Sequence, residues 1–318
     1  MGQVMENMEV LHIEYPPAPS SLLTGRHFAV AIGDFDGVHL GHQDVIRKAK
    51  QIAENQSLIT AVMTFNPHPR EVLGNARYSR YLAPLNKKLD LFKEMGVEYT
   101  FVVQFDESFS RLSARQFVDE MLRPLHVSAV VVGFDFTFGH KAQGTVDTLK
   151  QLCAGLIDVH VVEPYVVDGE KVSSTRIREH LHRGNLAKVK QYTGRDYFVT
   201  GTVVQGDGRG RTIGFPTANI RLDEPFVLPM NGVYAVRCLF KDRREFGVMN
   251  IGVRPTFYDD LTEPTLEVHL LDFAGDLYGE NVRIEFLEFI RPERKFPDKE
   301  ALVSQIEKDI EEARKIRC

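Results

Sequence analysis

A glycine-rich stretch that carries two histidines constrains the fold of this chain most strongly. It reads GDFDGVHLGH at residues 33–42, between an apolar run at 28–32 and a helix-like run at 43–54. A strand, a glycine-rich turn and a helix in that order direct backbone N–H groups and a helix N-terminus at a phosphate. In such a turn, His39 and His42 can donate hydrogen bonds to the charge that develops in phosphoryl or nucleotidyl transfer. The alternative is a tight turn whose histidines are solvated or cap the helix, and a short motif alone leaves both interpretations open.

Composition narrows the class of protein. The 318 residues suffice for two domains, at roughly 150 residues each. An apolar content of 43% and a charged content of 26% are typical of a soluble globular protein with buried cores. The formal charge of −5 includes no basic block, which argues against nucleic acid as a partner. The chain has no long apolar segment at its start, and its three scattered cysteines suit a reducing compartment without forming a metal cage, so we expect a cytoplasmic location without a membrane span.

The first half of the chain alternates strand and helix patterns. Residues 10–25 are rich in proline and are interpreted as a lead-in. The expected strands are 28–32, 58–65, 99–103, 127–132 and 159–167, and the expected helices are 43–54, 87–95, 114–122 and 176–183. This alternation predicts an α/β fold with a doubly wound parallel sheet.

Polar residues follow several of these strands, at the edge of the sheet where open α/β folds bind ligands. Asn-Pro-His-Pro ends the second strand and includes His68, and Asp135 lies in a glycine-bounded loop after the fourth. VSSTRIR at 172–178 precedes a helix, so its hydroxyls either cap that helix or hold phosphates. A lone loop histidine is more often solvated than functional, so the residues alone leave these alternatives open. The chain contains neither GxxxxGK[ST] nor GxGxxG, which removes the P-loop and the dinucleotide fingerprint as competitors.

The pattern changes after a short helix expected at 185–194. Short alternating strands and turns follow, and they predict a small antiparallel β-barrel. An amphipathic helix expected at 298–317 would cover this barrel. The sequence therefore predicts an α/β domain followed by a β-barrel domain with a C-terminal helix.

One strand of the second half carries a carboxylate. Apolar and polar residues alternate at 265–273, so they lie on opposite faces of the strand. One face carries Leu266, Val268 and Leu270, and the other carries Glu267 and His269. The second face is available to a cavity or to water, and a surface glutamate in a strand is ordinary, so the pattern alone assigns Glu267 no role.

The motifs together resemble one family across nearly the whole chain, from about Phe28 to the end. The HxGH element within GDFDGVHLGH resembles the signature of the nucleotidyltransferase superfamily. With TFNPHP, VVGFDFTFG and VSSTRIR, it is similar to the adenylyltransferase half of the bacterial bifunctional riboflavin kinase/FMN adenylyltransferases, also called FAD synthetases. The segments similar to their riboflavin kinase module are GRGRTIGFPTANI, NGVYAV, NIGVRPTF, LEVHLLDF, DLYGE and FIRPERKF.

This resemblance implies a nucleotidyltransferase-type domain at 1–184 and a riboflavin kinase domain at 185–318. It implies that the second domain phosphorylates riboflavin to FMN and that the first adenylylates FMN to FAD, with ATP and Mg²⁺ in both steps. In the first domain, the implied catalytic residues are His39, His42 and Arg178, and the implied FMN-binding residues are Asn66 and His68. The implied ATP-binding residues there are Gly33, Asp34, Phe35, His39, His42, Asp135, Ser173, Ser174, Thr175 and Arg178.

In the kinase domain, the resemblance implies that Glu267 is the base for the ribityl hydroxyl and that Thr217 and Asn219 hold Mg²⁺. The implied ATP-binding residues are Gly206, Arg211, Thr217, Asn219, Leu270, Asp272 and Tyr278, and the implied flavin-binding residues are Arg291, Arg294 and Phe296. The expected partners are these small molecules, and the oligomeric state stays open. Two rival hypotheses are a kinase whose first domain uses another nucleotidyl acceptor and a flavin-binding regulator with decayed catalysis.

Overall fold

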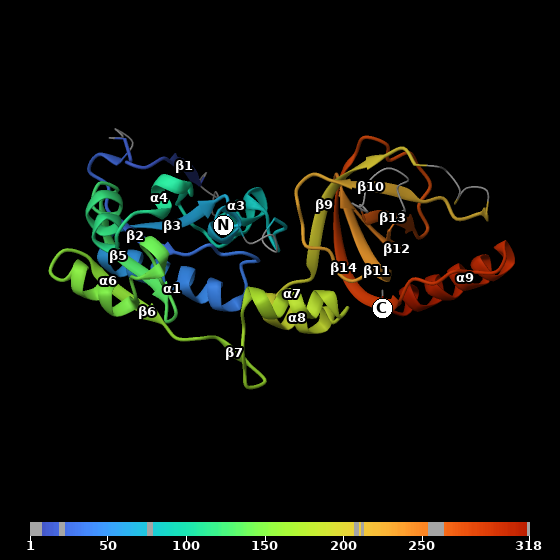
Figure 1. Ribbon diagram of the computed structural model, residues 1–318. Helices are drawn as coiled ribbons and strands as arrows, with labels where there is room; N and C mark the ends of the chain where they lie inside the picture. The colour runs from blue at the N-terminus through green and yellow to red at the C-terminus, as the bar shows by residue number, and fades with distance from the viewer. Residues whose placement is uncertain are drawn as a thin grey trace. The chain divides into compact units, whose positions relative to one another are not determined.

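The computed structural model of the chain describes residues 8–18, 23–74, 79–206, 210, 213–253 and 264–316. Contacts divide it into two compact units, Met1–Ser174 and Thr175–Cys318 (Figure 1).

The first unit is built on a six-stranded sheet in which every pair of neighbours is parallel. Its strands, in spatial order, are β1 (Glu9–Ile13), β4 (Tyr99–Gln104), β3 (Ile59–Asn66), β2 (Phe28–Ile32), β5 (Val127–Gly133) and β6 (Asp158–Val162). The predicted parallel sheet is confirmed, and β2 has the predicted bounds. The interpretation of residues 10–25 as a lead-in is wrong at its start, because β1 pairs with β4 along its whole length.

Helices cover both faces of this sheet because adjacent residues of a strand point to opposite sides. In β2, Phe28, Val30 and Ile32 join one core cluster, while Ala29 and Ala31 join the other. The alanine side packs against α1 (Leu40–Gln56) and α3 (Leu85–Glu94). The other side packs against α4 (Glu107–Ser110), α5 (Ala114–Gln116), the π-helix Phe117–Leu122 and α6 (Val146–Cys153). This is the doubly wound arrangement that the alternation predicted.

The strand expected at 159–167 is two separate elements. After β6 ends at Val162, a small hairpin of β7 (Val166–Val167) and β8 (Glu170–Lys171) follows. Pro164 lies in the gap between β6 and β7 and has no backbone N–H to pair, so a continuous strand does not form, and the turn of the hairpin contains two residues with positive φ, Asp168 and Gly169. Two helices come next, α7 (Ser174–His182) and α8 (Leu186–Thr193).

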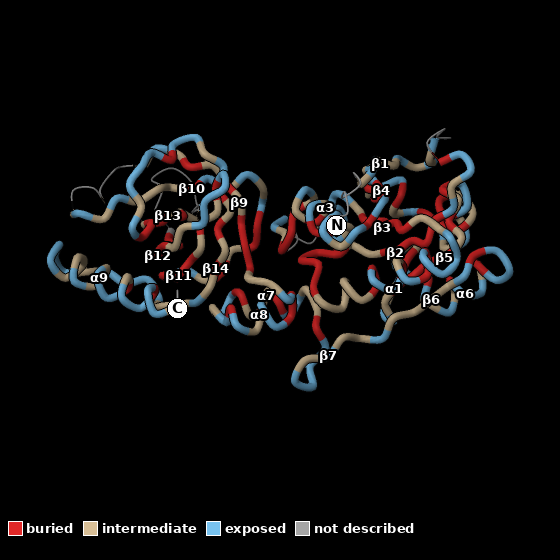
Figure 2. The backbone as a smooth tube through the Cα atoms, turned by 180° about the vertical axis from the view of Figure 1, so that it is seen from behind, coloured by how far each residue is buried: buried red, intermediate tan, exposed pale blue. Residues whose placement is uncertain are grey.

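The second unit contains a closed barrel, as predicted. Its strands in order around the barrel are β10 (Ala218–Leu222), β13 (Pro264–Leu270), β12 (Arg243–Val253), β11 (Gly232–Phe240), β14 (Asn281–Arg291) and β9 (Tyr197–Val204). The expected covering helix is α9 (Lys299–Ile316), which packs Ala313 and Ile310 against an apolar cluster that includes Val233 and Val248. In Figure 2 the buried segments follow the strands of both units, whereas α9 is mostly exposed or intermediate.

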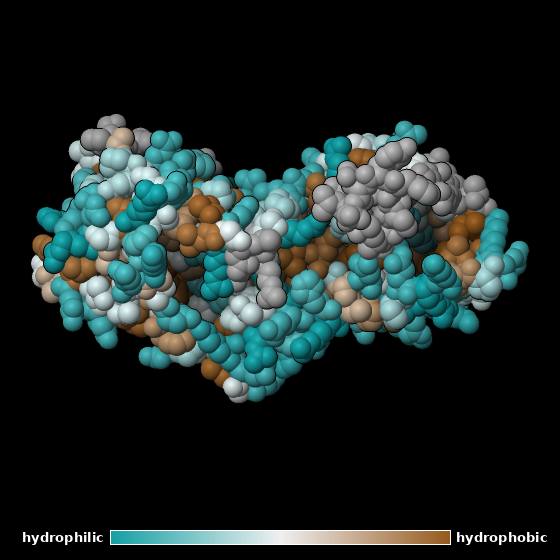
Figure 3. All heavy atoms as spheres, viewed as in Figure 1, coloured by the Kyte–Doolittle hydropathy of each residue, from teal (hydrophilic) through white to brown (hydrophobic). Residues whose placement is uncertain are grey.

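The visible surface is dominated by hydrophilic residues, and apolar residues form separate smaller areas on it (Figure 3). Within the described part of the chain, no helix combines the length and the apolar character needed to cross a membrane.

Candidate active sites

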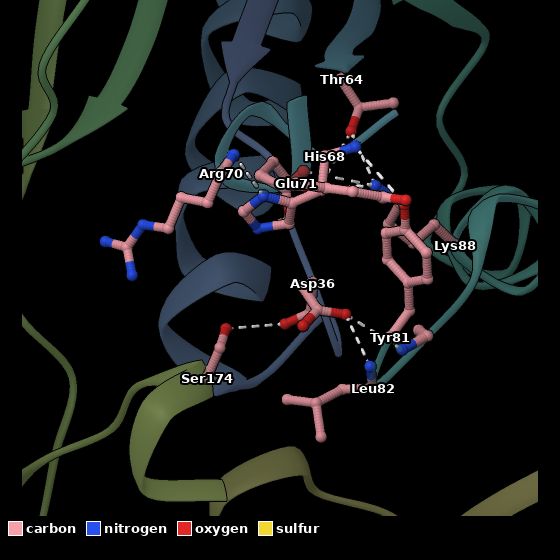
Figure 4. Close-up of polar contacts among 11 residues, drawn as sticks. Asp36, Thr64, His68, Arg70, Glu71, Tyr81, Leu82, Lys88 and Ser174 are labelled. Carbon is pink, nitrogen blue, oxygen red and sulfur yellow. Dashed lines mark hydrogen bonds and ion pairs between the residues drawn. The ribbon is translucent and has the colours of Figure 1, made fainter. Parts of the chain in front are cut away.

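The glycine-rich turn after β2 is fixed by a buried carboxylate. Asp36 is 2% exposed, and its Oδ1 accepts the backbone N–H groups of Leu82 (2.8 Å) and Ala83 (3.2 Å). Its carbonyl accepts a hydrogen bond from the hydroxyl of Ser174, the first residue of α7 (2.8 Å; Figure 4). Hydrogen bonds to a charged group contribute about 1.5–3 kcal/mol each. Asp36 therefore joins the turn to two distant segments, a role that the sequence did not assign to it.

The backbone of this turn is strained. Phe35 and Val38 have φ values of 57° and 40°, although neither is glycine. Such left-handed residues cost about 1–2 kcal/mol each, and they persist only where the surroundings impose them. Gly37 has φ 82°, and a Cβ there would lie 3.0 Å from Cβ of Leu82, so this position requires glycine. Strain of this kind clusters at functional sites.

The two histidines occupy the N-terminus of α1. His39 is its N-cap, and its Nδ1 accepts the backbone N–H of His42 (3.2 Å). The predicted alternative of a capping histidine is thus correct for His39, but it does not exclude a role in phosphate binding. An Nδ1 that accepts leaves the proton of the neutral ring on Nε2, which is then a donor. Gly41 between them leaves room for the His39 ring, because a Cβ there would lie 3.3 Å from it.

His68 is linked to the same turn through Asp34. The ring is 7% exposed, its Nδ1 accepts the N–H of Arg70 (3.0 Å), and its Nε2 lies 3.2 Å from Oδ2 of Asp34. Asp34 and His68 belong to two separate motifs, GDFDGVHLGH and TFNPHP, and neither motif gives a sign of this contact. The hydroxyl of Tyr81 donates to Glu71 and accepts the N–H of His68 (3.4 Å), so it links two residues of the loop after β3. Burial and the hydrogen bond to Glu71 raise the pKa of Tyr81, which keeps its hydroxyl protonated and donating.

A hollow of about 450 Å³ lies at the carboxyl ends of β1, β3 and β4. Its volume falls in the range of about 300–1,000 Å³ that is typical of small-molecule sites. The residues that line it are His12, Ile13, Glu14, Asn66, Pro67, Val72, Val102, Gln104, Phe105, Asp106 and Glu107. Asn66 is the only one among the site residues expected from the sequence. The others at the end of β1 were missed because that strand was interpreted as a lead-in.

Asp135 lies in the loop after β5, where it was expected. Its carboxylate contacts Nζ of Lys171 on β8 at 2.5 Å, and the same Nζ lies 4.3 Å from the ring centroid of Phe134. All three side chains are substantially exposed. The loop after β5 and the short hairpin are therefore joined at the carboxyl edge of the sheet.

The segment VSSTRIR (172–178), whose serine and threonine hydroxyls were expected to hold phosphates, is divided between the two units. Ser173 and Ser174 belong to the first unit, and Thr175 and Arg178 belong to the second. Ser174 is the member with a described contact to the glycine-rich turn. Its bond to the Asp36 carbonyl brings the start of α7 next to that turn.

In the barrel, Glu267 on β13 lies between two asparagines on neighbouring strands. Its register partners are Asn219 on β10 and Asn250 on β12. The predicted alternation is present, because Leu266 and Val268 are 3% and 1% exposed whereas Glu267 is intermediate. The carboxylate is thus carried on a rigid strand among hydrogen-bonding side chains.

The loop before β10 is held by His269, which shares a face of β13 with Glu267. Its Nδ1 donates to the carbonyl of Pro216 (2.8 Å), and its ring meets Phe215 edge-on. This fixes the residue that precedes Thr217. The side chain of Asn219 packs closely against Gly206: a Cβ at that position would lie 2.0 Å from Nδ2 of Asn219, so a larger residue would displace this side chain.

Three of the expected kinase residues, Thr217, Leu270 and Tyr278, line one small hollow of about 80 Å³. Asp272 lies outside that lining and forms a two-point ion pair with Arg314 of α9 (2.7 and 3.0 Å). Arg211 is outside the described residues.

The expected flavin residues are bound to α9. Arg291 makes a two-point ion pair with the buried Asp309, with its closest contact at 2.8 Å. Arg294 donates to Gln305 of the same helix, and both guanidinium groups lie over the ring of Phe296, 5.6 and 5.0 Å from its centroid. The three residues therefore form one group whose geometry depends on α9.

A strained phosphate-type turn with two histidines on a parallel sheet, and a separate barrel with a strand carboxylate, define a two-module enzyme that transfers groups from nucleotides. Comparisons agree with both modules. The model of the FAD synthetase family matches residues 23–176, and that of the riboflavin kinase family matches residues 193–317. The chain belongs to the family of bifunctional riboflavin kinase/FMN adenylyltransferases, whose members convert riboflavin to FMN and FMN to FAD.

Relatives support this over most of the chain. The protein of that name from Listeria monocytogenes is 43% identical over 308 residues, covering 96% of this chain and 98% of its own. The Escherichia coli protein of the same name is 38% identical, covering 88% and 90%. A solved structure titled macrolide-efflux protein, from Streptococcus pneumoniae, superposes with a TM-score of 0.88 at 32% identity, covering 96% of this chain and 99% of that one. The fold and module order predicted from the sequence are thus confirmed.

Proposed function

We propose that this chain makes FAD in two steps, with riboflavin phosphorylated on the barrel and FMN adenylylated at the glycine-rich turn. One observation carries the second assignment. His39 and His42 lie together at the N-terminus of α1, directly after a strained turn at the carboxyl edge of a parallel sheet. Backbone N–H groups, the helix dipole and an imidazole donor there all favour a triphosphate.

In the adenylyl step, a phosphate oxygen of FMN attacks the α-phosphorus of ATP, and the bond to the β,γ-pyrophosphate breaks. His42 and the Nε2–H of His39 donate to the α-phosphate oxygens as charge accumulates on them. Arg178 neutralises the departing pyrophosphate, and Ser173, Ser174 and Thr175 hold its oxygens together with the helix N-terminus. Gly33, Asp34, Phe35 and Asp135 complete the ATP site. Positioning and charge stabilisation suffice, so no covalent enzyme intermediate forms.

The hollow beside Asn66 supports an FMN-binding role for this part of the sheet. Its lining combines apolar side chains with amide, imidazole and carboxylate groups, which suits a ring that has one apolar and one hydrogen-bonding edge. Asn66 would contact the acceptor directly. His68 would act on the FMN side by holding Asp34 and the loop after β3, since both of its ring nitrogens have partners there.

In the kinase step, Glu267 removes the proton from the ribityl hydroxyl as that oxygen attacks the γ-phosphorus, and ADP leaves. Gly206, Arg211, Leu270, Asp272 and Tyr278 would hold the nucleotide, and Arg291, Arg294 and Phe296 would hold the flavin. Thr217 and Asn219 offer hydroxyl and amide oxygens, the hard donors that suit Mg²⁺, and they would hold the ion with the ATP phosphates. When bound, Mg²⁺ neutralises phosphate charge.

We further propose that the functional boundary falls between Gly184 and Asn185, before α8, and that the enzyme works in the cytoplasm. Support for the boundary comes from Gly184, which ends the turn after α7 with φ 68°, and from Asn185, which caps α8. Two buried free cysteines, Cys153 and Cys238, are consistent with a reducing compartment.

The direct test incubates the purified chain with riboflavin, ATP and Mg²⁺ and separates the flavins by chromatography. We expect FMN first and FAD later, with pyrophosphate released in step with FAD. FMN without FAD would favour the hypothesis of a different nucleotidyl acceptor. Unchanged riboflavin would favour the flavin-binding regulator.

A further inference from the structure

A buried lysine lies behind the glycine-rich turn. Lys88, on α3, has a side chain that is 2% exposed. Its Nζ donates to the carbonyl of Asp34 (2.8 Å) and to the hydroxyl of Thr64 (3.2 Å), and it lies 3.8 Å from Oδ1 of Asp34. Lysine is almost never fully buried without such partners, because the ammonium loses its hydration. Apolar side chains in place of the lysine and its polar partners together would avoid that cost, so the presence of a cation here calls for a reason beyond packing.

The partners of Lys88 are the ends of two strands. Thr64 on β3 also donates its hydroxyl to the Asp34 carbonyl (2.9 Å), so that one oxygen accepts from both side chains. Asp34 directly follows Gly33 at the carboxyl end of β2. Lys88 thereby fixes the peptide from which the strained turn departs. A donor on a carbonyl also polarises the peptide unit, which strengthens the next N–H as a donor.

The same helix holds the turn at a second point. Phe92 is four residues after Lys88, so both side chains lie on one face of α3. Its ring meets Phe35 edge-on, with centroids 5.7 Å apart, and Phe35 in turn meets His42 edge-on at 5.3 Å. A continuous series of ring contacts therefore connects α3, through Phe35 in the turn, to the imidazole of His42.

The contact of Asp34 with His68 extends this series of contacts to the loop after β3. One carboxylate lies near Lys88 through Oδ1 and near His68 through Oδ2. The loop that contains His68 adjoins the hollow that includes Asn66. Lys88 thus fixes the position of the turn relative to the loop beside that hollow.

We propose that Lys88 is a positioning residue for adenylyl transfer, which holds the ATP-side turn and the FMN-side loop in their reacting arrangement. The inference rests on the proposed function of the turn. Lys88 touches no substrate and acts through Asp34 and Thr64. A misplacement of about 1 Å at a reacting centre lowers the rate by roughly 10²-fold.

The decisive variant is Lys88→Met, which keeps the volume of the side chain and removes the cation. We expect kcat for FAD formation from FMN to fall by roughly 10²-fold, with the KM for ATP nearly unchanged. The melting temperature of the first unit should fall, because the substitution removes one partner of a buried polar group and leaves Asp34 and Thr64 without it. A structural role alone would lower activity only through the unfolded fraction, so a lowered kcat at temperatures where Lys88→Met is folded is diagnostic.

The matched control is Lys93→Met, the same substitution at an exposed position of α3, which should leave both readouts unchanged. Phosphorylation of riboflavin by the same protein should be unaffected in either variant. Lys88→Arg keeps a cation, so its kcat should lie between those of the wild type and Lys88→Met. All rates are taken at a temperature at which scanning calorimetry shows the variant folded.

Two results would overturn the proposal: a folded Lys88→Met with wild-type kcat, or a loss that follows the unfolded fraction. If Lys88→Met does not fold, Lys88→Arg decides. Its longer side chain cannot place a donor where Nζ of Lys88 lies, so a folded Lys88→Arg with the wild-type kcat at every temperature would also overturn the proposal. A wild-type chain that makes no FAD would instead remove the proposed function itself.

Discussion

The imidazole rings of His39 and His42 are stacked, with centroids 3.5 Å apart and planes inclined by 18°. Two features produce this arrangement. The backbone N–H of His42 donates to Nδ1 of His39, and the ring of His42 rests edge-on against Phe35. The pair is therefore held by the backbone of the turn and by a buried aromatic side chain. Donors fixed in advance are the ones that lower an activation barrier most, so this arrangement supports the role proposed for the two histidines at a phosphate.

The first prediction concerns His42. His42→Ala should slow FAD formation from FMN by roughly 10²–10³-fold, the loss typical of one transition-state donor. Riboflavin phosphorylation on the same chain should be nearly unchanged. His27→Ala is the matched control, because His27 precedes β2 at the opposite edge of the sheet and contacts Ser128. Equal loss of both activities, or equal loss in the control, would make His42 structural.

The second prediction concerns Glu267. Glu267→Gln preserves the shape of the side chain and removes the base, so it should lower the rate of riboflavin phosphorylation by about 10²–10⁴-fold. Riboflavin binding, followed by flavin fluorescence, should persist, and FMN supplied directly should still become FAD at the wild-type rate.

Glu288→Gln provides the comparison for this variant, since Glu288 is an exposed glutamate on β14 of the same barrel. It should leave the kinase rate unchanged. A Glu267→Gln protein that phosphorylates riboflavin as fast as this control would return Glu267 to the status of an ordinary surface residue.

The third prediction concerns the independence of the modules. A fragment that begins at Leu186 should phosphorylate riboflavin and make no FAD, because the barrel closes on itself. A fragment that begins at Thr175 should have the same activity and a higher melting temperature. The reason is that α7 packs on the barrel unit, where the carbonyl of Leu181 accepts the N–H of Met230 (3.0 Å). A soluble, folded fragment from Leu186 without kinase activity would contradict the proposed boundary.

The fourth prediction concerns pH. Burial raises the pKa of Cys153 to about 11, and it raises that of Cys238 from 9.0 to about 12. In the unfolded chain these thiols ionise near pH 9, whereas in the folded chain they stay protonated. Unfolding therefore releases protons above pH 9, so stability should fall between about pH 9 and pH 12. Urea titrations at several pH values measure this loss, and an additional Cys238→Ser comparison assigns its share.

The raised pKa values also predict slow thiol labelling. Both thiols are buried and their pKa values are raised, so alkylation of Cys153 and Cys238 at pH 8 should require unfolding. Peptide mapping after brief alkylation measures each site separately. Rapid native labelling of either cysteine would show that its environment is open to water.

Elements with strong local patterns could be predicted from the sequence. The run at Phe28–Ile32 is apolar at every position and is buried at every position, so its bounds were correct. In β14, charged residues alternate with the buried Val282, Ile284 and Phe286, which is the pattern of a half-buried strand, but the strand was not predicted. Its partners, β9 and β11, lie far away in the chain, so the pairing that closes the barrel could not be predicted from this segment alone.

The candidate sites divide in the same way. His39 could be proposed from the residues because its spacing from His42 in a glycine-rich turn carries chemical meaning, whereas Glu267 was proposed only through the family resemblance; both assignments stay predictions. Lys88 could not be proposed in either way, because Asn-Lys-Lys-Leu reads as a solvated start of a helix, and only the tertiary fold buries the second lysine. Asp36 was missed for a related reason, since its partners at Leu82 and Ala83 are backbone groups that leave no trace in residue types.

The pairing of β1 with β4 has a consequence for solubility. Five of the six residues of β4, YTFVVQ, are buried, and β1 covers the hydrogen-bonding edge of that strand. A chain shortened to begin at Arg26 would leave an apolar strand with unpaired N–H and carbonyl groups along one side. Such an edge is a template for pairing with the same edge of another molecule. We therefore expect the shortened protein to aggregate during expression, even though it retains every motif of both modules.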